Sequence, residues 1–377
     1  MASTRRQFSL AAAAAFAARG AAAAPTPSDW PVLQVVPLSG VNGGIGWHLR
    51  VGALVAFAEA NAAGAAFGRT LRLMTLDEEP GQVAAQVRGA LRDSEALALL
   101  ALHGRGTVGE LARSGLPARA GLPVLGVMSG SASAPGFDAP WLFNIRGTFA
   151  HEIDQVLAHA ATVHARRIVL VTGHDDDGHE VAALAAARAG SAGLQLMTVP
   201  PHPADSAEVA EAVTATLRLP HDVVVLATNT AAVAYFAKLY AAGGGRARLI
   251  ALSSAEATQL AAVVGASAAR GLLISQLVPH PRDPKIRLMR EFSAAYKRHG
   301  PPELAPTLAM TEAYIAARVL IAQLQRTGPQ ATGAALQRTL AAAPPSFELA
   351  GLPLSLKRRG ATFRSLSAIG RDGQLLF

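Results

Sequence analysis

The sequence of 377 residues contains no cysteine. Disulfide bonds and thiolate metal sites are therefore excluded, and stability must come from the burial of apolar side chains. Hydrophobic residues make up 51% of the chain, which is enough for large cores in roughly two or three domains. The composition is that of a globular protein, and a disordered chain is excluded.

Long apolar runs and dense basic patches are also lacking. Beyond the N-terminus, charge, glycine or proline interrupts each apolar run before it reaches the roughly 20 residues of a membrane span. The formal charge is +8, but the basic residues are scattered, and only "KRRG" at residues 357–360 forms a tight basic group. Because aromatic residues are few, at 5%, a nucleic-acid partner is not expected.

Common cofactor and hydrolase motifs are missing too. In the stretch "PLSGVNGGIGWHLRVG", residues 37–52, four glycines at positions 40–46 stand between an expected strand and an expected helix, but Leu49 stands where GxGxxG needs its third glycine. Asp77 ends the next apolar run, farther away than a ribose-binding acid should lie. The chain has no GxxxxGK[ST], GxSxG or HExxH. We interpret the glycines as a tight strand-to-helix turn and expect neither a cofactor nor catalysis.

The N-terminus carries a targeting pattern. In "STRRQFSLAAAAAFAARGAAAAP", Arg5 and Arg6 precede a weakly apolar, alanine-rich stretch that Arg19 interrupts. This resembles a twin-arginine export signal over residues 1–24, with cleavage expected between Ala22 and Ala24. Loss of these three arginines would reduce the formal charge from +8 to +5. We therefore expect a periplasmic mature protein.

The rest of the chain alternates short apolar runs with longer alanine-rich amphipathic segments. Apolar runs such as "VLQVVPL", "PVLGVMS" and "DVVVLATN", separated by helical segments, predict parallel sheets covered on both faces. The alternation restarts after residue 147, so two similar α/β units are expected in tandem. Helices are expected at about 283–299, 306–326 and 330–342, followed by short strands that need a sheet to join.

A family resemblance emerges from the order of these pieces. "LLALHGRGTVGELA", "LFNIRGTFAHEIDQVL", "RIVLVTGHDDDGHEVAAL" and "TLAMTEAYIAARVLIAQLQRTG" follow the glycine-rich turn in the order and spacing of type I periplasmic solute-binding proteins. The chain resembles the branched-chain amino-acid (Leu/Ile/Val-binding) receptors of ABC transporters. The resemblance implies two Rossmann-like lobes joined by a three-strand hinge, with the ligand cleft between them and the glycine-rich turn lining that cleft.

It also implies where the lobes begin and end. The N-terminal lobe should hold residues 25–147 and 279–342, and the C-terminal lobe residues 148–278 and 343–377. The hinge strands should be Asn144 to Thr148, Gln276 to Pro279 and the segment near Ala343 to Pro345. Ligands of open α/β sheets bind beyond the carboxyl ends of the strands, so contacts should come from residues just after strands.

Two loops of the first lobe meet this rule. One places Arg105, Gly106 and Thr107 at the start of a helix, and the other is the loop of residues 129–133, with Ser129, Gly130, Ser131 and Ser133. Free amides and small hydroxyls suit an anionic group, and a helix N-terminus adds about 0.3–1 kcal/mol. The resemblance implies that Thr107, Ser131 and Ser133 hold the ligand's α-carboxylate. The alternative is that Thr107 and Ser133 only cap helices or turns, and that Arg105 is a solvated surface residue.

The second lobe departs from the amino-acid receptors. Asp177 stands in "GHDDDGHE" where those receptors tend to have Tyr, and Ser253 stands where they place the glutamate that meets the ligand's ammonium. Asp177 is a candidate replacement for that charge, unless the ligand has no ammonium. Thr228 and Asn229 offer neutral hydrogen bonds, and Trp47 offers either an apolar wall or a core residue.

The "HDDDGHE" stretch is also a candidate metal site. Its carboxylates are consecutive and point in different directions, whereas a calcium loop alternates its ligands as DxDxDG. A helix cap with Asp177 facing the cleft fits the pattern better, and no metal is expected.

These observations favour a monomeric substrate-binding component of an ABC importer. It would capture a small carboxylate-bearing solute, an amino acid or a related organic acid or amide, and deliver it to the permease subunits in the inner membrane. A ligand-sensing subunit of a signalling system with the same fold is the alternative.

Overall fold

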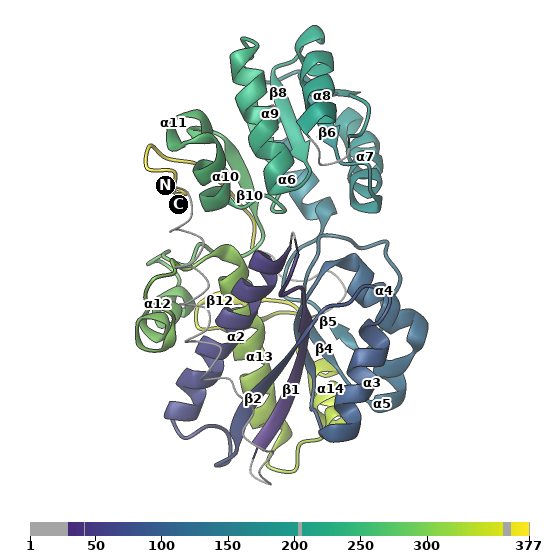
Figure 1. The fold of residues 1–377 in the computed structure, drawn as a ribbon, viewed down its shortest axis with the longest axis vertical. Helices are drawn as coiled ribbons and strands as arrows, with labels where there is room; N and C mark the ends of the chain where they lie inside the picture. Colours follow the sequence, from purple (N-terminus) through teal and green to yellow (C-terminus); the bar gives the residue numbers. More distant parts are fainter. Residues whose placement is uncertain (1–28, 41, 203–205, 357–362, 377) are drawn as a thin grey trace.

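The computed structural model describes residues 29–40, 42–202, 206–356 and 363–376. The predicted export signal, residues 1–24, lies outside these residues. Two α/β lobes lie one above the other in Figure 1, the first at the bottom and the second at the top.

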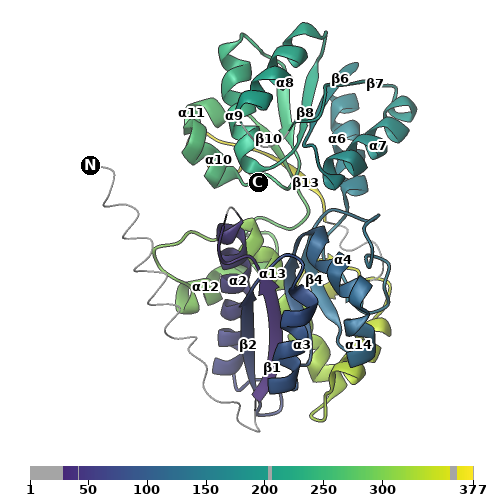
Figure 2. The same cartoon turned by 45° about the vertical axis from the view of Figure 1, so that its right-hand side comes forward.

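The first lobe is built on a parallel sheet with strand order β2-β1-β3-β4-β5. Its strands are β1 (Asp29–Val36), β2 (Thr70–Asp77), β3 (Leu99–His103), β4 (Val124–Met128) and β5 (Leu142–Phe143). On one face lie α2 (Gly43–Ala62), α12 (Arg287–His299), α13 (Leu308–Thr327) and α14 (Gly333–Ala341). On the other lie α3 (Val83–Asp93), α4 (Gly104–Ser114) and α5 (Leu116–Ala120). Figure 2 shows β1 and β2 between α2 and α3.

The second lobe repeats this plan on a sheet of order β13-β10-β9-β8-β6-β7, in which only β13 is antiparallel to its neighbour. The strands are β6 (Arg167–Thr172), β7 (Gln195–Thr198), β8 (Val223–Ala227), β9 (Arg248–Ala251), β10 (Leu273–Gln276) and β13 (Ser365–Ala368). One face carries α6 (Phe149–Thr162) and α7 (Asp176–Ala189), and the short 3₁₀ helix η1 (Gly190–Ala192) follows α7. The other carries α8 (Ser206–Arg218), α9 (Thr230–Ala242), α10 (Ala257–Val264) and α11 (Ala266–Ala269).

The apolar runs explain why these sheets form. All five residues of β8, "VVVLA", are buried, as a parallel strand covered by helices on both faces requires. The strands expected from "VLQVVPL", "PVLGVMS" and "DVVVLATN" are present as β1, β4 and β8, and so is the tandem repeat of α/β units.

The C-terminal segment differs from the expected lobe boundary. We expected residues 343–377 to lie in the second lobe, but β11 (Phe347–Leu349) and β12 (Leu352–Leu354) form a hairpin on the first lobe. Leu352, Leu354 and Leu356 alternate along the chain and are buried in the core of the first lobe, because an isolated hairpin is not stable in water. Only β13 joins the second sheet, so the chain crosses to the second lobe beyond Leu356 and not near Ala343.

Candidate functional site

A cavity of about 210 Å³ lies where the carboxyl ends of the two sheets face each other. The first lobe contributes residues that follow β3 and β4, including Gly104 and Ser129. The second lobe contributes residues that follow β6 and β8, including Asp175 and Thr228. This is the position at which open α/β sheets bind their ligands.

Half of the predicted contact residues line this cavity. They are Ser129, Gly130, Asp177, Thr228, Asn229 and Ser253. Asn42 and Ile45, from the glycine-rich turn, line it as well, so this turn faces the cleft. The "HDDDGHE" stretch forms the expected helix cap, because the Asp175 carboxylate accepts a hydrogen bond from the Gly178 amide at 2.7 Å and starts α7. Among the described residues, no three His, Asp or Glu side chains are placed so that they could hold a metal ion.

The predicted anion-binding hydroxyls already hold carboxylates of the protein. Ser131 and Ser133 donate to Oε2 of Glu180, on α7 of the second lobe, at 2.6 and 2.5 Å. Thr107 lies 2.5 Å from the Glu78 carboxylate and 2.8 Å from the backbone carbonyl of His103. None of these three hydroxyls lines the cavity, and their binding of a solute carboxylate stays a prediction.

Arg105 and Asp177, predicted as ligand contacts on opposite lobes, pair with each other. Arg105 Nη1 donates to Asp177 Oδ1 at 3.1 Å and lies 3.7 Å from Glu180 Oε2. Burial raises the pKa of Asp177, against the opposing effect of Arg105. Gly106 and Trp47 lie outside the cavity; Gly106 is exposed on α4, and the Trp47 ring stacks under the Arg50 guanidinium at 5.0 Å.

The floor of the cavity contains a charged side chain that the sequence reading missed. Arg146, in the hinge segment after β5, is buried and lines the cavity. Its Nη1 lies 3.3 Å from Oε2 of Glu312 on α13, and its Nη2 donates to the Ser253 hydroxyl of the second lobe at 2.5 Å. The rule that contacts follow strands would have found Arg146, because it stands three residues beyond β5.

A buried glutamate adds to the contacts between Arg146 and Ser253. Glu152, on α6, accepts from the amide of Ser253 at 2.7 Å and from its hydroxyl at 2.9 Å. Neither Glu152 nor Glu312 could be singled out from sequence, because single acids in amphipathic helices look like solvated residues.

Burial shifts the pKa values of three ionisable side chains near Arg146. Burial raises the pKa of Glu312 to about 6, with Arg146 opposing and Glu152 adding to the shift. Burial also raises the pKa of Glu152, against the charge of Arg146 and its hydrogen bonds from Ser253. Burial and the nearby Arg146 lower the pKa of His103, another lining residue, to about 4. At neutral pH the imidazole is therefore uncharged, and Arg146 is the cation on the cavity floor.

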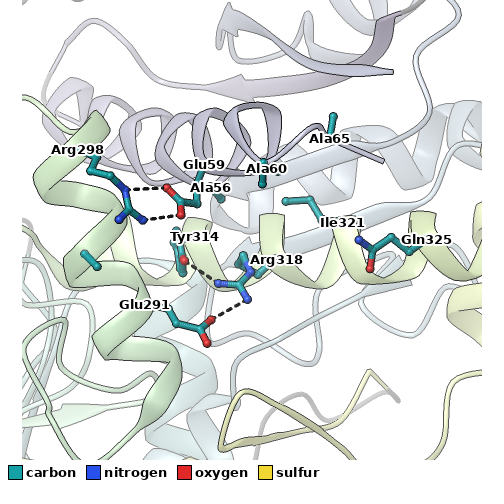
Figure 3. Close-up of a pocket in the computed structure, with 12 residues that line it drawn as sticks. Ala56, Glu59, Ala60, Ala65, Glu291, Arg298, Tyr314, Arg318, Ile321 and Gln325 are labelled. Atoms are coloured by element: carbon teal, nitrogen blue, oxygen red, sulfur yellow. Dashed lines mark hydrogen bonds and ion pairs between the residues drawn. The ribbon is translucent and has the colours of Figure 1, made fainter. Parts of the chain in front are cut away.

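A larger hollow, of about 380 Å³, lies away from the cleft between α2, α12 and α13. Figure 3 shows that its four charged side chains are paired: Arg298 with Glu59, and Arg318 with Glu291. Arg318 also donates to the Tyr314 hydroxyl at 2.7 Å. Since these charges satisfy one another, the cavity between the lobes is the better candidate site.

Among the described residues, no helix is long and apolar enough to cross a membrane. The comparison with curated proteins finds no match. Among solved structures, a substrate-binding periplasmic protein from Ralstonia solanacearum is 27% identical, with a TM-score of 0.84, and the match covers 92% of this chain and 99% of that one. An extracellular ligand-binding receptor from Verminephrobacter eiseniae is 24% identical, with a TM-score of 0.86 and coverage of 93% and 100%.

A branched-chain amino-acid ABC transporter protein from Thermus thermophilus with bound valine is 15% identical, with a TM-score of 0.79 and coverage of 92% and 94%. At that identity it supports the fold alone. The family model described as "Periplasmic binding protein" matches residues 30–369. With its two α/β lobes and the cavity between them, the chain belongs to the periplasmic binding protein family, type I, whose members bind solutes and are not enzymes.

Proposed function

We propose that this protein is the substrate-binding component of an ABC importer and that it captures a small carboxylate-bearing solute in the cavity between its lobes. The observation that carries the proposal is the cavity itself, which both lobes line at the carboxyl ends of their sheets. A site of this kind is assembled when the lobes close, so the solute gains contacts in the closed state that the open state lacks.

The size of the cavity favours a small solute. Its volume of about 210 Å³ lies below the roughly 300–1,000 Å³ of pockets for drug-sized ligands. An amino acid, a short organic acid or an amide fits this volume better than a long-chain ligand does.

The polarity of the cavity favours a charged or hydrogen-bonding solute. Arg146 has an Nε atom without a hydrogen-bond partner among the described residues. A guanidinium is a strong, planar donor to carboxylates. We propose that the acid group of the solute faces Arg146 and Ser129, and that Thr228 and Asn229 meet its other end.

A thermal-shift screen tests the proposal. Amino acids, short carboxylic acids and amides should be added separately, and a ligand at 100 times its Kd should stabilise the protein by about 2.7 kcal/mol. The bound compound should be recovered chemically unchanged. Turnover of the compound, or a failure of every member of the three classes to bind, would contradict the proposal.

A pair of isosteric variants then locates the site. Thr228→Val removes a hydroxyl from the cavity rim, whereas Thr214→Val removes an exposed hydroxyl from α8. Loss of one hydrogen bond of about 0.5–1.5 kcal/mol should weaken solute binding roughly 2- to 13-fold in Thr228→Val only. Calorimetry that finds equal affinities in the two variants would place the solute elsewhere.

Delivery to a permease is tested by co-purification from membranes. Recovery of ABC permease subunits with the solute-loaded protein is the expected result. Recovery of a sensor kinase in their place would favour a ligand-sensing subunit.

A further inference from the structure

The carboxylate of Glu180 occupies a complete hydrogen-bonding cradle on the opposite lobe. Its Oε2 accepts from the hydroxyls of Ser131 and Ser133, and its Oε1 accepts from the amides of Ala132 and Ser133 at 2.8 and 3.3 Å. Four donors of one loop therefore converge on one carboxylate that arrives from α7 of the other lobe. The Ser131 hydroxyl also accepts from the Ala134 amide, which fixes its direction.

The charge of Glu180 is well stabilised in this position. Its side chain is 9% exposed, and Arg105, of the first lobe, lies 3.7 Å from its Oε2. Burial alone would raise the pKa of Glu180, but its four hydrogen bonds together lower that pKa below the ordinary value near 4.5. The carboxylate is therefore ionised at neutral pH and has the contacts expected of a bound anion.

A free solute carboxylate would have to displace this tethered one. A group held on the same chain competes as if it were present at a millimolar concentration. A free acid that is less concentrated, and that has the same affinity for these donors, therefore does not displace Glu180 from the cradle. The neighbouring cavity does not include Ser131 or Ser133, but it does include Arg146.

We propose that Glu180 is a built-in carboxylate ligand of the first lobe: it holds the two lobes together in the absence of solute and excludes the solute's acid group from the loop of residues 131–133. The second half of this statement rests on the proposed function, and the first half does not. Arg146, which lines the cavity, is then the residue that recognises the acid group of the solute.

Removal of the carboxylate, followed by its replacement with a free one, tests the proposal. Glu180→Ala should leave the cradle vacant, so the lobes separate and the radius of gyration from small-angle scattering rises above that of the wild type. Acetate has the missing carboxylate and should refill the cradle. At tenfold excess over its Kd it should raise the melting temperature of Glu180→Ala by about 2 °C. The radius should stay large, because acetate fills the cradle but is not attached to α7.

Three controls make the result specific. The melting temperature of the wild type should rise less with acetate than that of Glu180→Ala, and sodium chloride at equal ionic strength should not replace acetate. Glu211→Gln, which neutralises an exposed acid on α8, should behave as wild type. In Glu180→Ala combined with Ser131→Ala and Ser133→Ala, the acetate response should disappear.

An unchanged radius in Glu180→Ala would overturn the proposal. So would an acetate response that is equal in the wild type, or one that survives in the triple variant. None of these readouts uses the natural solute, so their failure leaves the proposed function standing. Conversely, a failed solute screen leaves the acetate result interpretable.

Discussion

At the scale of single residues, the floor of the cavity has an imbalance of charge. Arg146 pairs with the buried Glu312 and acts electrostatically on the buried Glu152, and Oε1 of Glu312 has no hydrogen-bond partner among the described residues. A buried charge without full compensation destabilises the ionised form. One of the two carboxylates should therefore retain its proton more readily than an exposed glutamate does.

This imbalance predicts a pH dependence of stability. The pKa of Glu312 is raised from 4.5 to about 6 in the folded protein, with Arg146 and Glu152 facing it, so its contribution is fully present below pH 4.5 and is lost as the pH rises through about 6. The shift corresponds to about 2 kcal/mol. In chemical denaturation, the unfolding free energy of the wild type should fall by about 2 kcal/mol between pH 4.5 and 7 because of this group. This decrease should be absent in Glu312→Gln.

The matched control is Glu303→Gln, which neutralises an exposed acid of the same lobe. Its pH profile should parallel that of the wild type. A Glu312→Gln profile that also parallels the wild type would show that Glu312 titrates as an ordinary carboxyl.

At the scale of elements, the glycine-rich turn and the helix after it show why glycine is needed at two particular positions. A Cβ on Gly46 would lie 1.8 Å from the carbonyl oxygen of Pro37, so α2 starts in direct contact with the loop after β1. A Cβ on Gly52 would lie 2.1 Å from the carbonyl oxygen of Met310, so α2 packs closely on α13. Gly46 therefore permits the tight turn before α2, and Gly52 permits the close packing of α2 on α13.

Two substitutions in this turn should differ sharply. Gly46→Ala forces the backbone apart and should destabilise the protein by about 1–3 kcal/mol, as overpacking does. Gly44→Ala is the control, because its Cβ meets nothing within 4 Å and Ala favours a helix over Gly by about 0.5–1 kcal/mol. Urea denaturation should rank Gly44→Ala at or above the wild type and Gly46→Ala below it; the reverse order would refute the close contact.

The same elements show how far sequence reasoning reaches. Buried parallel strands are predictable because their apolar runs are continuous, as in β8. Residues after strands are predictable as lining residues of the cavity, as with Ser129 and Thr228. The pairs that build the site are not predictable. Arg146 and Glu312 are 166 positions apart, and Ser131 and Glu180 are 49 apart, and no local pattern marks their contact. The hairpin β11–β12 lies on the first lobe and not, as expected, on the second. The alternation of its apolar residues predicts one buried face, but it does not show which lobe covers that face.

At the scale of the whole molecule, export is the first property to test. The residues of the predicted signal lie outside the described structure, so the test is made in cells. If Arg5 and Arg6 form the recognition pair, changing both to Lys should leave uncleaved precursor in the cytoplasm. Fractionation and immunoblotting would reveal it, and normal export of the double variant would contradict the twin-arginine assignment.

The relative position of the lobes should depend on pH through Glu180. Because its pKa is lowered from 4.5 in the folded protein, the stabilisation from its ionised form is present above pH 4.5 and is lost as the pH falls through the lower folded value. Arg105 lies 3.1 Å from Asp177, 3.7 Å from Glu180 and 3.8 Å from Asp176, so three carboxylates of the second lobe share its charge.

Small-angle scattering of the wild type should therefore show the lobes separating on acidification below pH 4.5. Circular dichroism should confirm that the helices persist in the same samples, because acid unfolding would also enlarge the molecule. Glu180→Gln removes the titrating group, so its radius of gyration should already be large at pH 7 and should change little down to the same acid pH. If Glu180→Gln and wild type expand together along the same pH curve, the closure of the lobes depends on other carboxylates and not on Glu180.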